Sequence, residues 1–361
     1  MHSARGNSDD GESPWGDKGL SFSSTAPREL VHRRAIAEVF MTDLRRIGDG
    51  RYLAAAQWPR LHDFYHSGPG AYDTALMAET LRQATILVAH VMEGVALGQI
   101  FLMPAIAVRA LDGPTSDPGT PTEVHLRLDV KVSQRNIRGP VALQVGARFS
   151  VDGRPIASGS AGARLVDPVS YTRMRLGSGT DQRCGQTTGL PPARVGHRVS
   201  RNVVIGEACG ALAWPLHVDL TNPTLFDHPV DHVPGLLMVE GFRQVLRVQL
   251  GAPNLDFQTF DASFLKIVEL DGDALVVLRS VDLADQHGGT AQGAITVRGA
   301  VCVEFSCRFT LNAMKGPLQD RPHEQSVGQA PGTQHAWLPE PSPATGSPTF
   351  PQSSAAHQRG G

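Results

Sequence analysis

The sequence carries the same polar pattern, Glu-x-x-Arg-Gln, on two apolar segments that each have the length of a helix. The two copies are Glu79-Arg82-Gln83 and Glu240-Arg243-Gln244, and their glutamates stand 161 positions apart in 361 residues. Residues three and four apart share one side of a helix. Each copy therefore places a polar stripe on an otherwise apolar helix. The chain is expected to contain two versions of one folding unit.

Apolar residues with a period of two surround each helix and predict strands. The strands expected in the first unit are 31–44, 51–58, 124–132, 141–151 and 156–166, with a hairpin turn at Asp152-Gly153. Those expected in the second unit are 195–198, 211–219, 257–270, 274–283, 291–299 and 301–311. A sheet with one apolar face needs a cover, and the long helix is the nearest element that can provide it.

Strand, strand, long helix and several antiparallel strands, occurring twice, predict an α+β double hot-dog fold. Each antiparallel sheet would wrap around its central helix, and the two units would pair as an internal pseudo-dimer. The predicted divisions are a disordered tail (1–28), the first repeat (29–169), a linker (170–194), the second repeat (195–313) and a disordered tail (314–361).

Composition limits the possible partners. The formal net charge is -2 and the sequence pI about 6.7, which argues against nucleic acid or an anionic membrane as partner. No apolar run reaches the length of a membrane span, and the start of the chain lacks a secretion signal. Four cysteines show no C-x-x-C pair and no metal-ligand spacing. We expect a soluble cytoplasmic protein without metal or cofactor that acts on small molecules or proteins.

Two sets of motifs resemble the AfsA-type A-factor biosynthesis family. The second-repeat set is Phe226-Asp227-His228-Pro229-x-Asp231-His232-Val233-Pro234-Gly235 followed by Glu240-x-x-Arg243-Gln244. The first-repeat set is Ala54-Ala55-Ala56-Gln57-Trp58-Pro59, His62-x-Phe64-Tyr65, Ala78-Glu79-Thr80-x-Arg82-Gln83 and Phe101-Leu102-Met103. The resemblance implies a double hot-dog acyltransferase. It would move a β-ketoacyl group from acyl-carrier protein to the hydroxyl of dihydroxyacetone phosphate, toward a γ-butyrolactone signal.

Such a transfer needs a base, donors for the oxyanion and an anchor for the phosphate. Histidine suits the first role because its ordinary pKa is about 6.5, and we expect His228 to be the base. Pro234-Gly235 should open a helix, so the N–H groups of Gly235 and Leu236 would face the oxyanion. A structural role for the loop histidine is the alternative.

The remaining candidates lie on the polar stripes and in the loop. Glu79 and Glu240 would orient the histidine or carry protons, and Arg82 and Arg243 would hold the phosphate. Buried Glu–Arg ion pairs are the alternative for both stripes. The substrate-binding candidates also include Gln83, Gln244, Asp231 and His232, of which the last two would otherwise only fix the turn.

A more distant resemblance is to the β-hydroxyacyl-carrier-protein dehydratases, with His228, Gly235 and Glu240 at matching positions. It implies that histidine and carboxylate come from different units. His228 would then face Glu79, and Glu240 would face the first-repeat loop. Where the AfsA-type family has Tyr-His-Asp-Pro, this chain has Tyr72-Asp73-Thr74-Ala75, and His62 or His66 would have to substitute. The alternative functions are therefore a dehydratase, a thioesterase, or a non-catalytic regulator that binds an acyl ligand.

Overall fold

A computed structural model describes residues 19–65, 72–111, 120–137, 139–176, 187–270 and 273–311. Residues 1–18 of the tail expected at 1–28, the tail expected at 314–361 and the candidate His66 lie outside these residues. The first repeat comprises η1 (Arg28–Val31), η2 (Ile36–Glu38), β1 (Met41–Gly48), β2 (Arg51–Trp58), α1 (Thr74–Val91), β3 (Ile100–Leu102), β4 (Ala105–Ala110), β5 (Thr122–Asn136), β6 (Gly139–Val151) and β7 (Arg154–Val166). Helix α2 (Pro168–Arg175) follows it.

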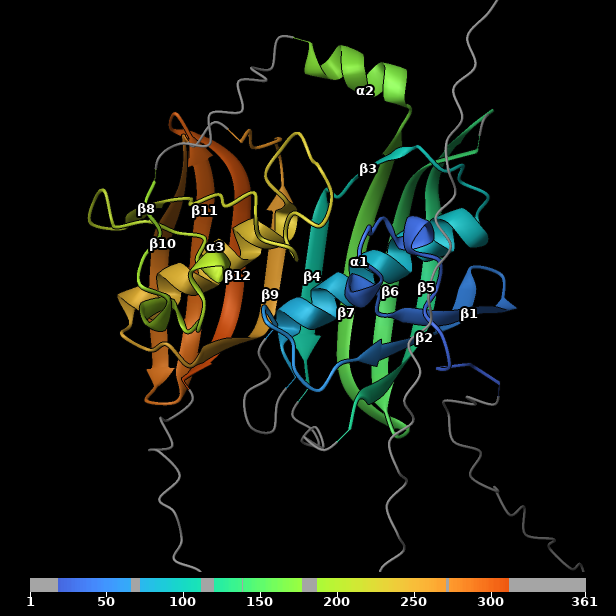
Figure 1. Ribbon diagram of the computed structural model, residues 1–361, viewed down its shortest axis with the longest axis horizontal. Helices are drawn as coiled ribbons and strands as arrows, with labels where there is room; N and C mark the ends of the chain where they lie inside the picture. The colour runs from blue at the N-terminus through green and yellow to red at the C-terminus, as the bar shows by residue number, and fades with distance from the viewer. Residues whose placement is uncertain are drawn as a thin grey trace, which may run out of the picture. The chain divides into compact units, whose positions relative to one another are not determined.

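The second repeat has the same order of elements with fewer strands. It comprises η3 (Pro192–Val195), η4 (Ser200–Asn202), β8 (Ala213–Pro215), α3 (Gly235–Gln249), β9 (Leu255–Phe264), β10 (Ala274–Asp285), β11 (Gly288–Val297) and β12 (Ala300–Leu311). The predicted double hot-dog architecture, with one long helix in each unit, is confirmed. Figure 1 shows α1 and α3 in front of the sheet, on the same face.

The strands of both repeats form one continuous antiparallel sheet. Their order is β1-β2-β5-β6-β7-β4-β9-β12-β11-β10-β8, with β3 also paired to β7. The repeats meet where β4 pairs with β9, and there Ile106 lies opposite Ala262 and Val108 opposite Phe260. The two sheets expected from the sequence are thus joined through backbone hydrogen bonds at this seam.

The two long helices, α1 and α3, are almost entirely enclosed. Helix α1 begins at Asp73, whose side chain accepts the N–H of Ala75 at 2.8 Å, as an N-cap should. Even its polar residues Glu79 and Gln83 have no exposed surface. In β12, Val303, Phe305, Cys307 and Phe309 are buried while the residues between them are exposed, so the period-two pattern marks the face that packs on the helix.

The segment before β1 was predicted wrongly as a strand. Within 31–44, η1 ends at Val31, η2 spans Ile36–Glu38, and the strand begins only at Met41. The strand expected at 195–198 was also wrong, because this segment runs from the last residue of the 3-10 turn η3 toward η4. In 211–219 only Ala213–Pro215 is a strand. Irregular backbone is used here because the turns place side chains against the helix stripe.

Three other boundaries differ from expectation. Residues 19–28 were expected to be disordered, yet Ser21 N–H donates to Asp43 and Ala26 N–H donates to the carbonyl of Met41. The expected linker contains most of α2. Strand β4, which joins the repeats, was not predicted because six residues next to a loop give a weak pattern.

Gly293 on β11 tests how closely α3 packs on the sheet. A methyl group at this position would overlap the ring of Phe242 on α3 and lie 2.8 Å from the carbonyl oxygen of Val277. We predict that Gly293→Ala lowers the free energy of unfolding by about 1–3 kcal/mol, measured by urea denaturation. Gly210→Ala, whose nearest neighbour would lie 3.9 Å away, is the control, and an equal effect in both variants would contradict the packing.

Candidate active site

The first polar stripe forms a buried cluster around Glu79. Arg82 donates from Nε to Oε2 and from Nη2 to Oε1, both at 2.8 Å, and Gln83 donates to Oε1 at 2.7 Å. The turn between η1 and η2 adds Arg33, whose Nη2 lies 2.6 Å from Oε1. Burial alone would raise the pKa of Glu79, but the guanidiniums of Arg33 and Arg82 lower it to about 2. Glu79 is therefore a carboxylate at neutral pH.

The second stripe repeats this cluster around Glu240. Arg243 donates from Nε to Oε2 at 2.7 Å, Gln244 donates to Oε1 at 2.9 Å, and His197 Nε2 lies 2.8 Å from Oε1. Arg33 and His197 thus occupy matching places in the two repeats. Although burial opposes ionisation, Arg243 and the hydrogen bond from His197 hold the pKa of Glu240 well below its ordinary range.

The two glutamines hold the turn segments against the helices. Gln83 donates to the carbonyl of Glu38 and accepts the N–H of Phe40. Gln244 makes the same two bonds with Asn202 and Val204. The two glutamine side chains thus form hydrogen bonds with backbone groups of the irregular turn segments. The stripe pattern in the sequence did not predict this structural role.

Each loop before a helix contacts the other repeat. Asp227 accepts the N–H groups of Arg34 at 2.6 Å and Ala35 at 2.8 Å, and Arg33 donates to the carbonyl of Thr224 at 2.9 Å. In the opposite direction, Arg243 donates from Nη1 to Asp73 at 2.7 Å. The second-repeat loop therefore lies over the Glu79 cluster, and the start of α1 lies against the Glu240 cluster.

His228 sits in this loop beside the first cluster. Its Nδ1 is buried without a hydrogen bond and lies 3.6 Å from a carboxylate oxygen of Asp227. Burial and then the charges of Arg82 and Arg33 lower the pKa of His228 below 6.5. The imidazole is consequently neutral at pH 7, the form that a general base requires.

The two clusters differ in their access to solvent. The side chains of Arg82 and His228 are 19% and 38% exposed, whereas those of Glu240, Arg243 and Asp73 are at most 1% exposed. Both ends of the Arg243 guanidinium are also taken by Asp73 and Glu240. Solvent therefore reaches Arg82 and His228 at the first cluster, while the second is a closed ion network.

Asp231 and His232 lie apart from this cluster, next to α2. Tyr171 donates its hydroxyl to both oxygens of Asp231 at 2.9 Å, and His232 Nδ1 lies 2.7 Å from Asp231. Arg175 pairs with Glu269 and with Asp231. Helix α2 thereby holds the loop before α3, and no motif in the sequence predicted this role.

The start of α3 and the first-repeat histidine complete the set of candidates. Helix α3 begins at Gly235, and its N-cap Pro234 makes no side-chain bond to the helix N–H groups. A side chain at Gly235 would approach the ring of Phe264 at 3.1 Å, which accounts for glycine there. His62 uses Nδ1 to accept the N–H groups of Phe64 and Tyr65, so it fixes a turn.

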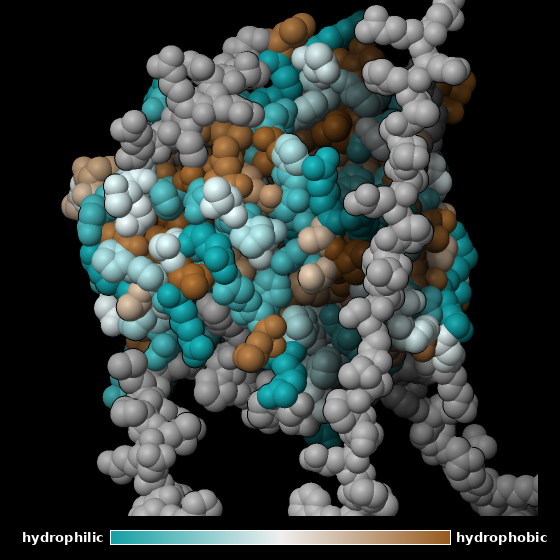
Figure 2. All heavy atoms as spheres, in the orientation of Figure 1, coloured by the Kyte–Doolittle hydropathy of each residue, from teal (hydrophilic) through white to brown (hydrophobic). Residues whose placement is uncertain are grey.

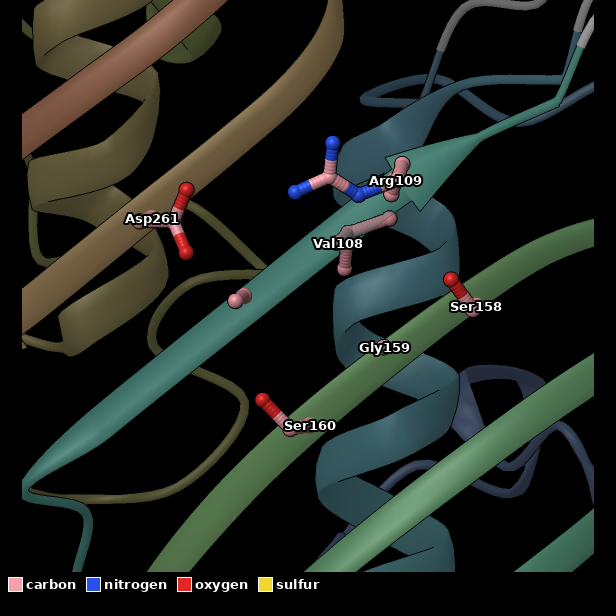
Figure 3. A pocket seen from close by; sticks show the side chains of 7 residues that line it. Val108, Arg109, Ser158, Gly159, Ser160 and Asp261 are labelled. Atoms are coloured by element: carbon pink, nitrogen blue, oxygen red, sulfur yellow. The ribbon is translucent and has the colours of Figure 1, made fainter.

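A separate hollow lies on the opposite face of the sheet. Figure 3 shows its strands in front of α1, with Arg109 on β4 and Asp261 on β9 at the seam between the repeats. It is lined by Ala107, Val108, Arg109, Ser158, Gly159, Ser160 and Asp261. No predicted site residue reaches it.

Two further observations concern partners. Within the described ranges, no group of three or more histidine, cysteine, aspartate or glutamate side chains could hold a metal ion. None of the helices in those ranges is long and apolar enough to cross a membrane. On the helix-bearing face, Figure 2 shows hydrophobic side chains at the surface among hydrophilic ones.

The duplicated arrangement of sheet and long helix places this chain in the class of double hot-dog proteins. Within it, this chain belongs to the A-factor biosynthesis hotdog domain family (AfsA), which it matches over residues 17–167 and 180–313. It is 35% identical over 298 residues to a 2-oxo-3-(phosphooxy)propyl 3-oxoalkanoate synthase of Streptomyces virginiae, covering 79% of this chain and 97% of that one. The protein of that name from Streptomyces coelicolor is 32% identical over 295 residues, covering 81% and 91%.

Solved structures with similar shapes include a 12:0-ACP thioesterase from Umbellularia californica and an acyl-ACP thioesterase from Bacteroides thetaiotaomicron. The first is 10% identical with a TM-score of 0.46, covering 71% of this chain and 93% of that one. The second is 12% identical with a TM-score of 0.43, covering 71% and 97%. At these scores the similarity supports no conclusion about activity.

The depressed pKa of Glu79 predicts how stability depends on pH. The pKa of Glu79 in the folded state is about 2, below its ordinary value of 4.5. The carboxylate therefore contributes its full stabilisation above pH 4.5, and this stabilisation is lost as the pH falls toward 2. We predict that Glu79→Gln is less stable than the parent chain at pH 6 and that the difference narrows toward pH 2–3. Urea denaturation across this range checks it. Glu304→Gln, at an exposed pair with Arg279, is the control, and a pH-independent difference for Glu79→Gln would refute the linkage.

Proposed function

We propose that this protein is an acyltransferase of γ-butyrolactone signal biosynthesis. It moves a β-ketoacyl chain from the thioester of acyl-carrier protein to the hydroxyl of dihydroxyacetone phosphate. The names of its relatives describe the resulting ester, a 3-oxoalkanoate of a phosphooxy-2-oxopropyl group, and the alignment spans nearly the whole of those proteins. The observation that carries the proposal within this chain is the accessible, neutral His228 beside the Glu79 cluster.

The chemistry follows from the protonation states. His228 accepts the proton of the acceptor hydroxyl as its oxygen attacks the thioester carbonyl carbon. The tetrahedral intermediate collapses, the carbon–sulfur bond breaks, and the protonated imidazole gives its proton to the leaving thiolate. Ester and free thiol are then the products, and His228 is neutral again. Asp227, 3.6 Å from Nδ1, stabilises the transient imidazolium.

The N–H groups of Gly235 and Leu236 are proposed to bind the oxyanion. They stand at the N-terminus of α3, where the helix dipole favours negative charge. Removal of one such donor costs about 2.7–4 kcal/mol of transition-state stabilisation in comparable sites. Glu79 contributes indirectly, because it holds Arg82 and Arg33 in place beside His228.

Arg82 is the proposed anchor for the phosphate. Arg33 is buried between Glu79 and the carbonyl of Thr224, and Arg243 is enclosed by carboxylates. Arg82 keeps one face toward solvent while its Nε and Nη2 bind Glu79. We further propose that acyl-carrier protein is the partner, that the two repeats act as an internal pseudo-dimer with one working site, and that the reaction takes place in the cytoplasm.

Purified protein incubated with a β-ketoacyl-carrier protein and dihydroxyacetone phosphate tests the function. The expected product, detected by mass spectrometry, is the phosphorylated ester, formed only when the acceptor is present. Free acid or an enoyl chain without need for an acceptor would instead establish a thioesterase or dehydratase. Binding of the acyl chain with no product of any chain length would establish a non-catalytic regulator.

We predict that His228→Gln lowers kcat/KM for ester formation by about 10²–10⁴-fold, because the base is lost while the loop keeps a polar side chain. His287→Gln, in the exposed turn between β10 and β11, should leave the rate unchanged. Unaltered kcat/KM in a folded His228→Gln protein would exclude His228 as the base. Circular dichroism and thermal denaturation establish that each variant is folded.

The pH dependence of kcat/KM tests whether the positive charge of Arg82 lowers the pKa of His228. Because the pKa of His228 is lowered, the acid limb of kcat/KM should fall below pH 6.5. Arg82→Met removes a positive charge next to the imidazole, so the limb should move upward toward 6.5. A limb that stays in place or moves downward would contradict the coupling between these two side chains.

A further inference from the structure

The first repeat keeps a histidine at a backbone position that favours glycine. His32 ends η1 in the left-handed region with φ 53°, and its counterpart at the end of η3 is Gly196 with φ 74°. A non-glycine residue in this region costs about 1 kcal/mol or more. The first repeat accepts this backbone strain at His32, whereas the second avoids it with Gly196. This difference indicates a role for the His32 side chain.

A second histidine of the first repeat also has a glycine as its counterpart in the second repeat. His90, near the end of α1, is 11 positions after Glu79, and the position 11 after Glu240 is Gly251. His32 Nε2 and His90 Nε2 are 3.0 Å apart. The pair is therefore present only in the repeat whose glutamate cluster is accessible.

The hydrogen bonds fix the tautomers of this pair. His90 Nδ1 is 2.8 Å from the carbonyl oxygen of Val95, which can only accept, so Nδ1 carries the hydrogen. Neutral His90 then accepts at Nε2, and His32 donates from its Nε2. The edge of Phe101 packs on His32 with ring centroids 5.0 Å apart. His32 is thus held rigidly, with Nδ1 as its remaining nitrogen.

The groups that act on His32 come from two neighbouring segments. They are Arg82 and His90 from α1 and His228 from the loop before α3. Arg82 is in addition linked to the backbone next to His32, through a 3.4 Å bond from Nη2 to the carbonyl of Val31. Burial first, then Arg82, His90 and His228, lower the pKa of His32 to about 4, so its imidazole is neutral at pH 7.

An anion in this place would reverse the electrostatics. A phosphate dianion beside Arg82 offsets the positive charge that keeps His32 neutral, and a protonated Nδ1 would donate a charge-assisted hydrogen bond to it. Two donors of Arg82 already bind Glu79, so few of its N–H groups remain for such an anion. A protonated His32 supplies a further donor, and its hydrogen bond to His90 already fixes the position of its ring.

We propose that His32, positioned by His90, forms with Arg82 a subsite for a phosphate monoester dianion, and that binding of the dianion is coupled to uptake of a proton by His32. This inference rests on the proposed function and names the group that recognises the phosphate of the acceptor substrate. The proton comes from solvent, and no bond in the ligand is broken.

Isothermal titration calorimetry with glycerol 3-phosphate tests the subsite on the full chain. Titrations at pH 7 in two buffers with different enthalpies of ionisation give the number of protons taken up, which a merely structural role of His32 would not change. We expect uptake on the order of one proton in the parent chain, together with measurable affinity. His32→Gly should bind about 10-fold or more weakly and take up fewer protons.

The His32→Gly variant is favourable for folding, because glycine adopts the left-handed conformation without strain. Arg298→Gly is the matched control, since Arg298 is also left-handed at φ 49° but lies in the turn between β11 and β12. It should bind like the parent chain. His32→Asn, which tolerates this conformation, serves as the second variant and should show the same loss. Unchanged affinity and proton uptake in both His32 variants would overturn the proposal.

The phosphate could belong to either substrate, since the arm of a carrier protein also contains one, as a diester. Titration with dimethyl phosphate distinguishes the sources, and binding of this diester as tight as that of the monoester would refute a dianion subsite. The acyl-transfer assay separates the subsite from the function. If His32→Gly forms the ester with unaltered kcat/KM, the subsite is refuted and the proposed function stands. If the parent chain binds the phosphate through His32 but forms no ester, the acyltransferase function is refuted and the subsite stands.

Discussion

A carboxylate buried in the middle of an apolar helix must be paired, and this requirement shapes both repeats. Neither Glu79 nor Glu240 is exposed to solvent, so each is paired with an arginine from its own helix and with a second hydrogen-bonding side chain from the turn segment before the sheet. To bring Arg33 and His197 to the helices, the chain forms 3-10 turns instead of strands at 28–38 and 192–202. Removing one partner of such a buried pair generally costs about 3–5 kcal/mol.

The two clusters meet this requirement in different ways. At Glu240, Asp73 comes from the first repeat to neutralise Arg243, and Arg247 and Asp256 extend the network through a 3.0 Å pair. All these charged groups are paired inside the protein. At Glu79 the loop before α3 places His228 near the partly exposed Arg82, and burial followed by the charge of Arg82 lowers the pKa of the imidazole. Asp73, which belongs to the departure noted in the sequence, is thus part of the closed cluster.

The fold was largely predictable from the sequence, because helix stripes and period-two strands are local patterns. The repeated Glu-x-x-Arg-Gln predicted the duplication, and alternation located β5 to β7 and β9 to β12 to within a few residues. Strand β4 was missed since its partner β9 lies in the other repeat, about 150 positions away. Helix α2 was missed because none of its residues is buried, so it has no apolar face, and the contacts of Tyr171 and Arg175 that hold it are long-range. The site was less predictable: Arg33 and His32 were hidden in a segment that alternates like a strand, and the approach of His228 to the Glu79 cluster came from resemblance rather than from spacing.

The pairing of β4 with β9 joins two halves of one chain, and each half is encoded by its own stretch of the sequence. In a symmetric dimer of identical chains, every substitution appears twice, so a change that closes one catalytic pocket closes the other as well. Here the halves inherit their mutations independently. A substitution in one half therefore leaves the other unchanged. The second repeat has a closed network of paired charges and glycine at both places where the first repeat has an imidazole, while the first repeat has the partly exposed Arg82.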